Sequence, residues 1–360
     1  MQLFPTLALV ALATSSSLAY RSPGAKDHKA SKAAILEAQR AANASLDERS
    51  AHYKLVKSYH GNTFFKDMHY FTGHDPSHGS VHYVDHNEAH SSGLIGMMDG
   101  HAMMRVAPHH SGTHRSVRPS SDVSFTEGLL ILDNLHMPTG CGTWPSFFTV
   151  PLDSNWPAGG EIDVIEGVGG MNRNKYSIHT TSGCRVVESQ MVMHAAQLTG
   201  GQNCDAEATD DTGCAISGTQ NGDFGVDYNR NHGGVHVLDW NSNTGIRIWF
   251  FPRNNIPQDI QDGHPNPASW PNPRASWPAT HCHMDSHFYN HVATFTNTLC
   301  GTWAGSSAVW HGKQPGQSKS CAAHTGHNSC ESWLRSGNAN MENAYWKIKS
   351  LKIYQIHRRS

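Results

Sequence analysis

From about residue 55 onward, the sequence is divided into short β-prone runs that are separated by clusters of Gly, Pro, Asn and Asp. Many runs alternate apolar and polar residues, as strands of sheets with one buried face do, and no long amphipathic helix interrupts them. About 300 residues of this texture predict an all-β fold, a β-sandwich of the jelly-roll kind. The Pro-rich stretch 264–278 is expected to be a loop without strand pairing.

The first 54 residues differ from this pattern. MQLFPTLALVALATSSSLAY begins the chain, and its short apolar stretch followed by small residues predicts a signal peptide, residues 1–19, cleaved after Ala19. A short anchor helix is the alternative. Residues 20–54 are rich in Ala, Lys and Glu and are interpreted as a pro-region or linker, with a docked helix as the alternative. We therefore expect a secreted protein, extracellular or in a cell wall, with its main domain in residues 55–360.

Charge and hydropathy exclude two classes of partner. The 27 Lys and Arg residues nearly balance 29 Asp and Glu, so a nucleic-acid-binding surface is not expected. Outside the N-terminus no apolar run has the roughly 18–20 residues of a membrane span, so no membrane contact is expected after signal cleavage. The 27 His residues are scattered along the chain, and we interpret most of them as solvated surface. The protein is expected to be a monomer.

Eight cysteines all lie after position 140. An even number of cysteines in a secreted chain predicts disulfides. Structural zinc is not expected, because the chain has no C-x-x-C pair. The pairing stays open, since eight cysteines allow 105 connectivities.

The segment EIDVIE at 161–166 places three acids in an apolar run. In a regular strand Glu161 and Asp163 would share one face, while Glu166 would fall among the core aliphatics of the other, which is costly for a carboxylate. One β-bulge near Val164–Ile165 removes this conflict and places the three acids on one face. An exposed acidic edge strand is the alternative interpretation, although the flanking Gly residues favour close approach by a ligand.

This arrangement would have a chemical use. Two Glu side chains leaning toward each other across the bulge could bring their carboxyl groups to about 5–6 Å, near the separation of the nucleophile and the acid/base in a retaining glycosidase. Asp163, between them, could hydrogen-bond Glu161 and help to keep Glu166 protonated by repulsion between like charges. Such chemistry needs no cofactor and no metal, and we predict none.

These residues also carry a family resemblance. CGTWPSFFTV at 141–150 and NWPAGGEIDVIEGV at 155–168 closely resemble the fungal laminarinase-like endo-1,3(4)-beta-glucanases of glycoside hydrolase family 16, whose signature is E-I-D followed by two aliphatics and E. Further matches follow in order, over roughly residues 55–357. They are YFTGHDPSHGSVHYVD, RSVRPSS, GLLILDNLHMP, IRIWFFPRNNIPQDI, DSHFYNHVATFTNTLCGTWAG and AYWKIKSLKIYQ.

The resemblance implies a curved, concanavalin-like jelly-roll sandwich of two antiparallel sheets, with a β-glucan cleft across its concave face. It also implies hydrolysis of internal β-1,3 or mixed β-1,3/1,4 glucosidic bonds with retention. By position in the signature, Glu161 matches the nucleophile, Asp163 its helper and Glu166 the acid/base. The expected partner is therefore a β-glucan polysaccharide.

Substrate binding is expected from aromatic residues, because the apolar faces of sugars stack on rings. We predict this role for Trp156, Trp303 and Trp144, with core packing as the alternative for each. His179 matches a family histidine that faces the cleft, and it could position or tune the carboxylates; a satisfied core histidine is the alternative. The chain departs from the family at Phe148, where a Trp is typical, so one sugar subsite is expected to be reshaped.

Two other functions use the same scaffold. A transglycosylase would let a sugar hydroxyl, in place of water, intercept the covalent intermediate, and the three acids do not separate the two reactions. An inactive β-glucan-binding lectin is the other alternative, although such proteins typically lose one or both of the catalytic acids, and Glu161 and Glu166 are both present here.

Overall fold

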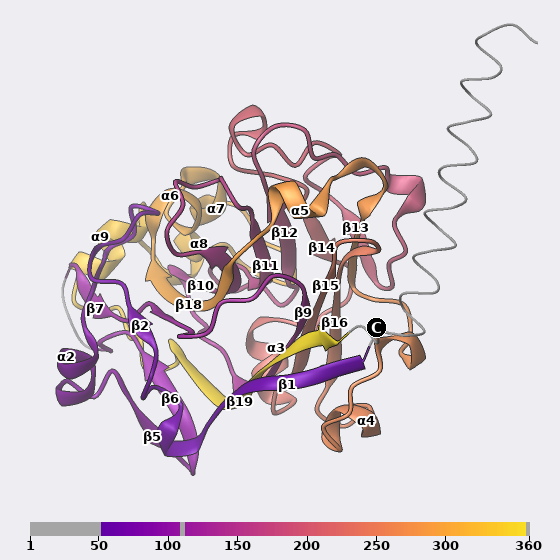
Figure 1. Ribbon diagram of the computed structural model, residues 1–360. Helices are drawn as coiled ribbons and strands as arrows, with labels where there is room; N and C mark the ends of the chain where they lie inside the picture. The colour runs from indigo at the N-terminus through magenta and orange to yellow at the C-terminus, as the bar shows by residue number, and fades with distance from the viewer. Residues whose placement is uncertain (1–51, 109–111, 358–360) are drawn as a thin grey trace, which may run out of the picture. The chain divides into compact units, whose positions relative to one another are not determined.

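The computed structural model describes residues 52–108 and 112–357 (Figure 1). The predicted signal peptide and nearly all of the predicted linker lie outside these residues. Within the described residues, no helix is both long enough and apolar enough to cross a lipid bilayer.

Strands dominate the structure, and most belong to two antiparallel sheets of eight strands each. The first sheet has the order β17-β16-β15-β9-β19-β6-β5, and β1 also pairs with β19. Its strands are β1 (His52–His60), β5 (Ile95–Met98), β6 (His101–Arg105), β9 (Gly128–His136), β15 (Gly234–Asn241), β16 (Gly245–Pro252), β17 (Ala275–Pro278) and β19 (Tyr345–His357).

The second sheet has the order β13-β14-β12-β11-β10-β18-β8-β2. Its strands are β2 (His69–Tyr70), β8 (Pro119–Ser120), β10 (Thr143–Pro151), β11 (Glu161–Glu166), β12 (Lys175–His179), β13 (Ala196–Leu198), β14 (Ile216–Gly218) and β18 (His291–Leu299). A small third sheet contains β3 (Gly73–His74), β4 (Val81–Tyr83) and β7 (His114–Ser116). The predicted all-β fold with two antiparallel sheets is confirmed.

The helices are short and lie between the strands. They are α2 (His86–Ser91), α3 (Gly225–Arg230), α4 (Gln258–Gln261), α5 (Met284–His287), α6 (Gly301–Ala304), α7 (Ser307–His311), α8 (Cys321–Thr325) and α9 (Cys330–Arg335). Single 3₁₀ turns lie at Gly61–Thr63, Glu188–Gln190, Glu207–Thr209, Pro267–Ser269 and Ala279–His281.

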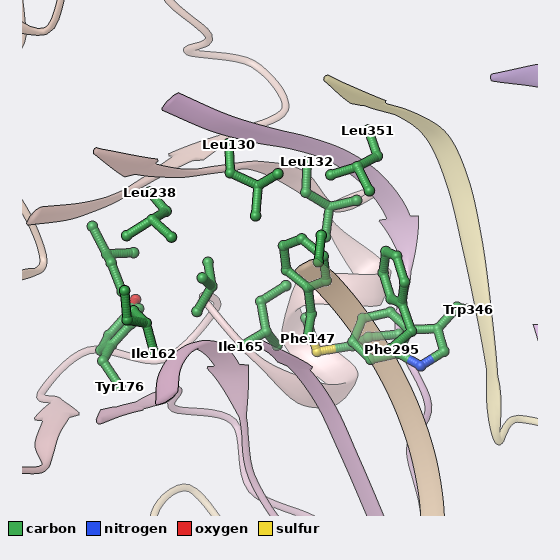
Figure 2. Close-up of a cluster of buried hydrophobic side chains, with 14 of the residues drawn as sticks. Leu130, Leu132, Phe147, Ile162, Ile165, Tyr176, Leu238, Phe295, Trp346 and Leu351 are labelled. Carbon is green, nitrogen blue, oxygen red and sulfur yellow. The ribbon is translucent and has the colours of Figure 1, made fainter. Parts of the chain in front are cut away.

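The main core lies between the two large sheets (Figure 2). Leu130 and Leu132 of β9 contribute from the first sheet, and Phe147 of β10 with Ile162 and Ile165 of β11 from the second; all are at most 1% exposed. The other face of β9 is also buried, in a smaller cluster with residues of β16 and α4. Because one face of β11 is committed to the core, its other face is the one available for polar side chains.

The stretch at 264–278 is not entirely a loop, contrary to the sequence prediction. Its last four residues form β17, which pairs with β16 from Gly245–Pro278 to Ile248–Ala275. β17 is an edge strand, and Pro278 is its last residue. Proline is tolerated at such positions because the missing N–H weakens no interior ladder. The high proline content therefore indicated an edge strand as well as a loop.

All eight cysteines form disulfides, as predicted. The pairs are Cys141–Cys321, Cys184–Cys282, Cys204–Cys214 and Cys300–Cys330. Cys141–Cys321 and Cys300–Cys330 tie the helical segment after β18 to the strands. The segment also contributes Trp310 and Leu334 to a separate buried hydrophobic cluster, so the cross-links add to its packing.

Most histidines of the described residues are exposed, as predicted, but several are buried. His114, His236 and His291 are fully buried, and His179 and His287 nearly so. His236 packs between Tyr228 and Phe250, with ring centroids 5.8 and 4.8 Å away. Composition alone could not separate these buried rings from surface histidines.

Candidate active site

The acidic strand β11 contains the predicted bulge. Phe147 of β10 pairs with Ile165, and the next residue, Phe148, pairs with Asp163, so Val164 has no partner in this ladder. Pairing with β12 shows the same irregularity between Asp163 and Glu166. The extra residue keeps the aliphatic side chains of β11 in the core, with Val164 only 1% exposed. The three acids therefore belong to the opposite face of the sheet.

The side chain of Asn174 stabilises this bulge. Its Oδ1 accepts a hydrogen bond from the backbone N–H of Glu166 at 3.0 Å, and its Nδ2 donates to the carbonyl oxygen of Val164 at 2.9 Å. A bulge leaves backbone groups without ladder partners, and an unpaired buried group is costly. The amide of Asn174, which is fully buried, satisfies one donor and one acceptor at once.

Asp163 lies at the centre of a hydrogen-bonded group on β11 and β12. Its Oδ2 accepts a hydrogen bond from the Ser177 hydroxyl at 2.7 Å and lies 3.2 Å from Nε2 of His179. His179 is also the strand partner of Glu161. The prediction that β12 neighbours the acidic strand is confirmed, and His179 is in direct contact with one of the three acids.

Each glutamate accepts a hydrogen bond from an indole. Nε1 of Trp156 donates to Oε2 of Glu161 at 3.0 Å, and Nε1 of Trp144 donates to Oε1 of Glu166 at 3.0 Å. The Trp156 side chain is 43% exposed, so its ring is open to a ligand, whereas Trp144 is half-buried. A donor of this kind favours an ionised carboxylate and fixes its orientation.

The electrostatics of the group oppose ionisation of both glutamates. Burial raises the pKa of Glu166, and the charge of Asp163 adds to this; the charge of Lys175 and the Trp144 hydrogen bond act in the opposite direction. Burial and Asp163 likewise raise the pKa of Glu161, against the charge of His179. Burial by itself lowers the pKa of His179, but its bond to Asp163 and the nearby acids outweigh this, so that pKa is raised.

Trp303, in α6, lies beside Trp144 and Lys175. Its ring meets the ring of Trp144 edge-on, with centroids 5.6 Å apart. The ammonium of Lys175 lies 4.5 Å from the centroid of the Trp303 ring. Trp303 is half-buried, so core packing and substrate contact both account for its position. The structure thus brings the predicted residues together, while the roles assigned to them remain predictions.

Phe148 is nearly buried on the same face. The guanidinium of Arg118 lies 5.4 Å from its ring centroid and 5.3 Å from that of the exposed Phe71. At this position the surface therefore presents a planar cation and not the face of an indole.

One group of side chains has the spacing of metal ligands. The ligand atoms of Glu161, Asp163 and His179 lie within 4.8 Å of one another, and no other such group of three was found in the described part of the chain. Asp163 and His179 are at hydrogen-bonding distance. We therefore interpret this group as a hydrogen-bonded network and not as a metal site.

Sequence reasoning missed Ser177, Lys175 and Asn174. Ser177 and Lys175 could have been predicted from the sequence, because side chains on a strand alternate and residues 175, 177 and 179 share one face of β12. Asn174 precedes the strand and carried no such signal.

Comparison with known proteins supports the interpretation of this site. A family model described as the XgeA-like catalytic GH16 domain matches residues 68–354. The chain belongs to glycoside hydrolase family 16. The predicted family and enzyme class, a glycoside hydrolase, are thereby confirmed.

Among curated family 16 relatives, a probable glycosidase of Schizosaccharomyces pombe is 40% identical over 307 residues, covering 84% of this chain and 69% of that protein. An endo-1,3(4)-beta-glucanase of Arthroderma benhamiae is 35% identical over 317 residues, covering 85% of this chain and 65% of that protein. The chain spans about half the length of several Aspergillus relatives, 48% in the Aspergillus clavatus protein.

Two solved family 16 structures have the same fold. Laminarinase 16A from Phanerochaete chrysosporium, with two bound β-glucans, is 31% identical with a TM-score of 0.76, covering 85% of this chain and all of that one. An elongating β-1,3-glucosyltransferase is 32% identical with a TM-score of 0.73, covering 84% of this chain and all of that one. The predicted jelly roll is therefore confirmed.

Proposed function

We propose that the protein is a secreted endo-β-glucanase that hydrolyses internal β-1,3 or mixed β-1,3/1,4 glucosidic bonds with retention. The observation that carries the proposal is the bulge at Val164, which places Glu161, Asp163 and Glu166 on one face of β11. The indole donors on the two glutamates add to this support. The relatives named endo-1,3(4)-beta-glucanase support the substrate class.

In the first step, Glu166 donates its proton to the glycosidic oxygen while a carboxylate oxygen of Glu161 forms a bond to the anomeric carbon. The bond between that carbon and the leaving oxygen breaks, and a glycosyl ester of Glu161 remains. In the second step, the ionised Glu166 takes a proton from water. The water oxygen attacks the anomeric carbon, and the ester to Glu161 breaks with net retention.

The environment of Glu166 suits its role, whereas that of Glu161 combines opposing effects. Burial and the Asp163 charge favour a protonated Glu166, as an acid near neutral pH requires. Burial and Asp163 also raise the pKa of Glu161, to about 8, which opposes the ionised form that a nucleophile needs. The Trp156 N–H and the charge of a protonated His179 act against this and favour the carboxylate. Asp163 is a positioning residue in this scheme, because it orients His179 and adjusts both glutamates.

We further propose sugar contacts for the predicted aromatic residues. The exposed ring of Trp156, adjacent to Glu161, is the strongest of these. Trp144 and Trp303 are half-buried and would offer a ring edge or part of a face. No metal or cofactor takes part in the scheme.

We propose export to the cell exterior or cell wall, with residues 1–19 as the signal peptide, residues 20–54 as a pro-region or linker and residues 55–360 as the catalytic domain. Four disulfides support this location, because they persist in oxidising compartments. We expect a monomer, which analytical ultracentrifugation would test.

The deciding experiment measures reducing ends released from laminarin and the anomeric form of the first product by NMR. Wild type should release the β-anomer. Glu161→Gln should abolish turnover, and Glu161→Ala should regain it with azide, yielding an α-glycosyl azide. Glu207→Gln, at an exposed position outside the site, is the matched control and should keep full activity. Wild-type rates in purified Glu161→Gln would exclude the assignment.

Transglycosylation is a second candidate, favoured by the likeness to the β-1,3-glucosyltransferase structure. In that reaction a sugar hydroxyl takes the place of water in the second step. Adding laminari-oligosaccharide acceptors and measuring the ratio of lengthened products to hydrolysed ones distinguishes the two. A binding protein without activity would release no reducing ends in the same assay.

A further inference from the structure

Lys175 is a cation beside Glu166 that neither the sequence prediction nor the proposed mechanism uses. It is the strand partner of Glu166, from β12 to β11. Its ammonium lies 4.5 Å from the centroid of the Trp303 ring, and Trp303 contacts Trp144, whose indole donates to Glu166. Lys175, Trp303, Trp144 and Glu166 thus form a closed set of contacts.

The Trp303 ring fixes the position of this charge. An ammonium over the face of an indole is attracted by the electrons of the ring, so the flexible lysine side chain is restrained there. Among the described residues Lys175 forms no ion pair with a carboxylate, so no carboxylate neutralises its charge at short range. A restrained cation near an acid favours loss of the proton from that acid.

Among the other charged groups around Glu166, the acids raise its pKa, and His179 lowers it less than Lys175 does. On β11, Asp163 and Glu161 are acids, and Asp163 raises the pKa of Glu166. On β12, His179 is hydrogen-bonded to Asp163. Trp144, which bonds to Glu166 from β10, carries no charge, and neither does Trp303 of α6, which packs against Trp144. Lys175 is thus the cation of this group that is not hydrogen-bonded to an acid.

We propose that Lys175, held against Trp303, is a positioning residue that sets the pH at which Glu166 gives up its proton. The effect of Lys175 on the Glu166 proton does not depend on the proposed function. Only its consequence, a change in the alkaline limit of hydrolysis, rests on that function. Without the lysine charge, burial and Asp163 would keep Glu166 protonated to higher pH. The acid form of Glu166 would then persist to higher pH. The ionised form, which activates water in the second step, would become populated only at that higher pH.

The test is a carboxyl-carbon NMR titration of protein labelled with [δ-¹³C]glutamate, with the Glu166 signal assigned from Glu166→Gln. In Lys175→Met at low salt, the Glu166 midpoint should rise by about 0.5–1 pH unit, less than for a closely paired charge. Lys175→Arg should keep the wild-type midpoint. Lys349→Met removes an exposed lysine from the other large sheet and should change nothing. High salt should reduce the difference between wild type and Lys175→Met.

The inference is overturned if natively folded Lys175→Met titrates like wild type, or if Lys175→Arg shifts as far as Lys175→Met. The alkaline limb of kcat/KM on laminarin should move upward together with the NMR midpoint. A change in KM with an unmoved limb would make Lys175 a substrate contact and would also overturn the proposal. Wild type without activity on laminarin would refute the proposed function, while the NMR midpoint would still decide the role of Lys175.

Discussion

Trp144 donates its indole N–H to Oε1 of Glu166 across 3.0 Å and thereby links β10 to the carboxyl group at the end of β11. The bond orients the proposed acid. It also favours the ionised form of the acid, because a hydrogen bond from a donor stabilises negative charge.

Trp144→Phe should therefore reduce kcat and raise the pKa of Glu166 while it keeps most of the ring contact with Trp303. A hydrogen bond to a charged group contributes roughly 1.5–3 kcal/mol, so we expect kcat to fall by about 10- to 100-fold. The measurement is kcat and kcat/KM on laminarin as a function of pH. Trp270→Phe, which removes a similar indole–carboxylate bond to Asp259 elsewhere, is the control. An unchanged kcat and pH profile in Trp144→Phe would contradict this role.

The second prediction concerns the bulge. Asn174→Ala leaves the N–H of Glu166 and the carbonyl of Val164 without their partners. Each unpaired buried group costs about 1–3 kcal/mol, so the free energy of unfolding should fall by about 2–4 kcal/mol, and activity should fall because Glu166 is no longer held. Urea unfolding followed by tryptophan fluorescence measures the first effect.

The control for this variant is Asn221→Ala, where the amide is exposed and bonds only to the side chain of Arg173 among the described contacts. It should change stability by no more than about 0.5 kcal/mol. If both variants were equally stable, Asn174 would not be what supports the bulge.

The third prediction concerns pH and a core histidine. Burial lowers the pKa of His236 to about 3, against about 6.5 in the unfolded chain. Between these values the unfolded chain binds a proton that the folded protein does not, so stability is complete above pH 6.5 and declines as the pH falls toward 3. His236→Phe should remove this contribution, because Phe fits beside Phe250 and Tyr228 and does not titrate.

Urea unfolding at pH 7 and pH 5 measures the effect. Between these two values the stability of His236→Phe relative to wild type should improve by up to about 2 kcal/mol, or 1.36 kcal/mol per pH unit below 6.5. His82→Phe, which replaces an exposed histidine, should show the wild-type change. Parallel pH dependence in His236→Phe and wild type would refute the linkage.

The fourth prediction compares two disulfides. Cys184–Cys282 spans 98 residues, whereas Cys204–Cys214 spans 10. Chain entropy alone gives a stabilisation of about 4.7 kcal/mol for the longer loop and about 2.7 kcal/mol for the shorter one. Replacing each pair by two alanines should lower the thermal midpoint, and the loss should be larger for Cys184–Cys282 than for Cys204–Cys214. Since all four cysteines are buried, the cavities left behind are comparable, and a reversed order would rule out loop closure as the main term.

The arrangement of the acids was predictable because the sequence of β11 does not fit a regular strand. Three acids and three aliphatics cannot be sorted onto two faces by strict alternation, and one bulge is the simplest solution. His179 was predicted from the family resemblance, and its place on the neighbouring strand agrees with the structure.

Other features depend on contacts between distant segments and could not be read from local pattern. Trp303 and Lys175 meet through the convergence of α6 and β12, which neither segment encodes alone. The pairing of eight cysteines is underdetermined for the same reason. β17 escaped prediction because proline indicates both loops and sheet edges, and only the partner strand distinguishes them.

The bulge at Val164 also restricts how this segment could change in length. Substituting one aliphatic for another within 162–165 would alter packing locally. Inserting or deleting a single residue there would instead exchange the two faces for the rest of β11. A carboxylate would then point into the core and an aliphatic side chain away from it. The aliphatic residues of this stretch can therefore vary, whereas the number of residues between the two glutamates cannot.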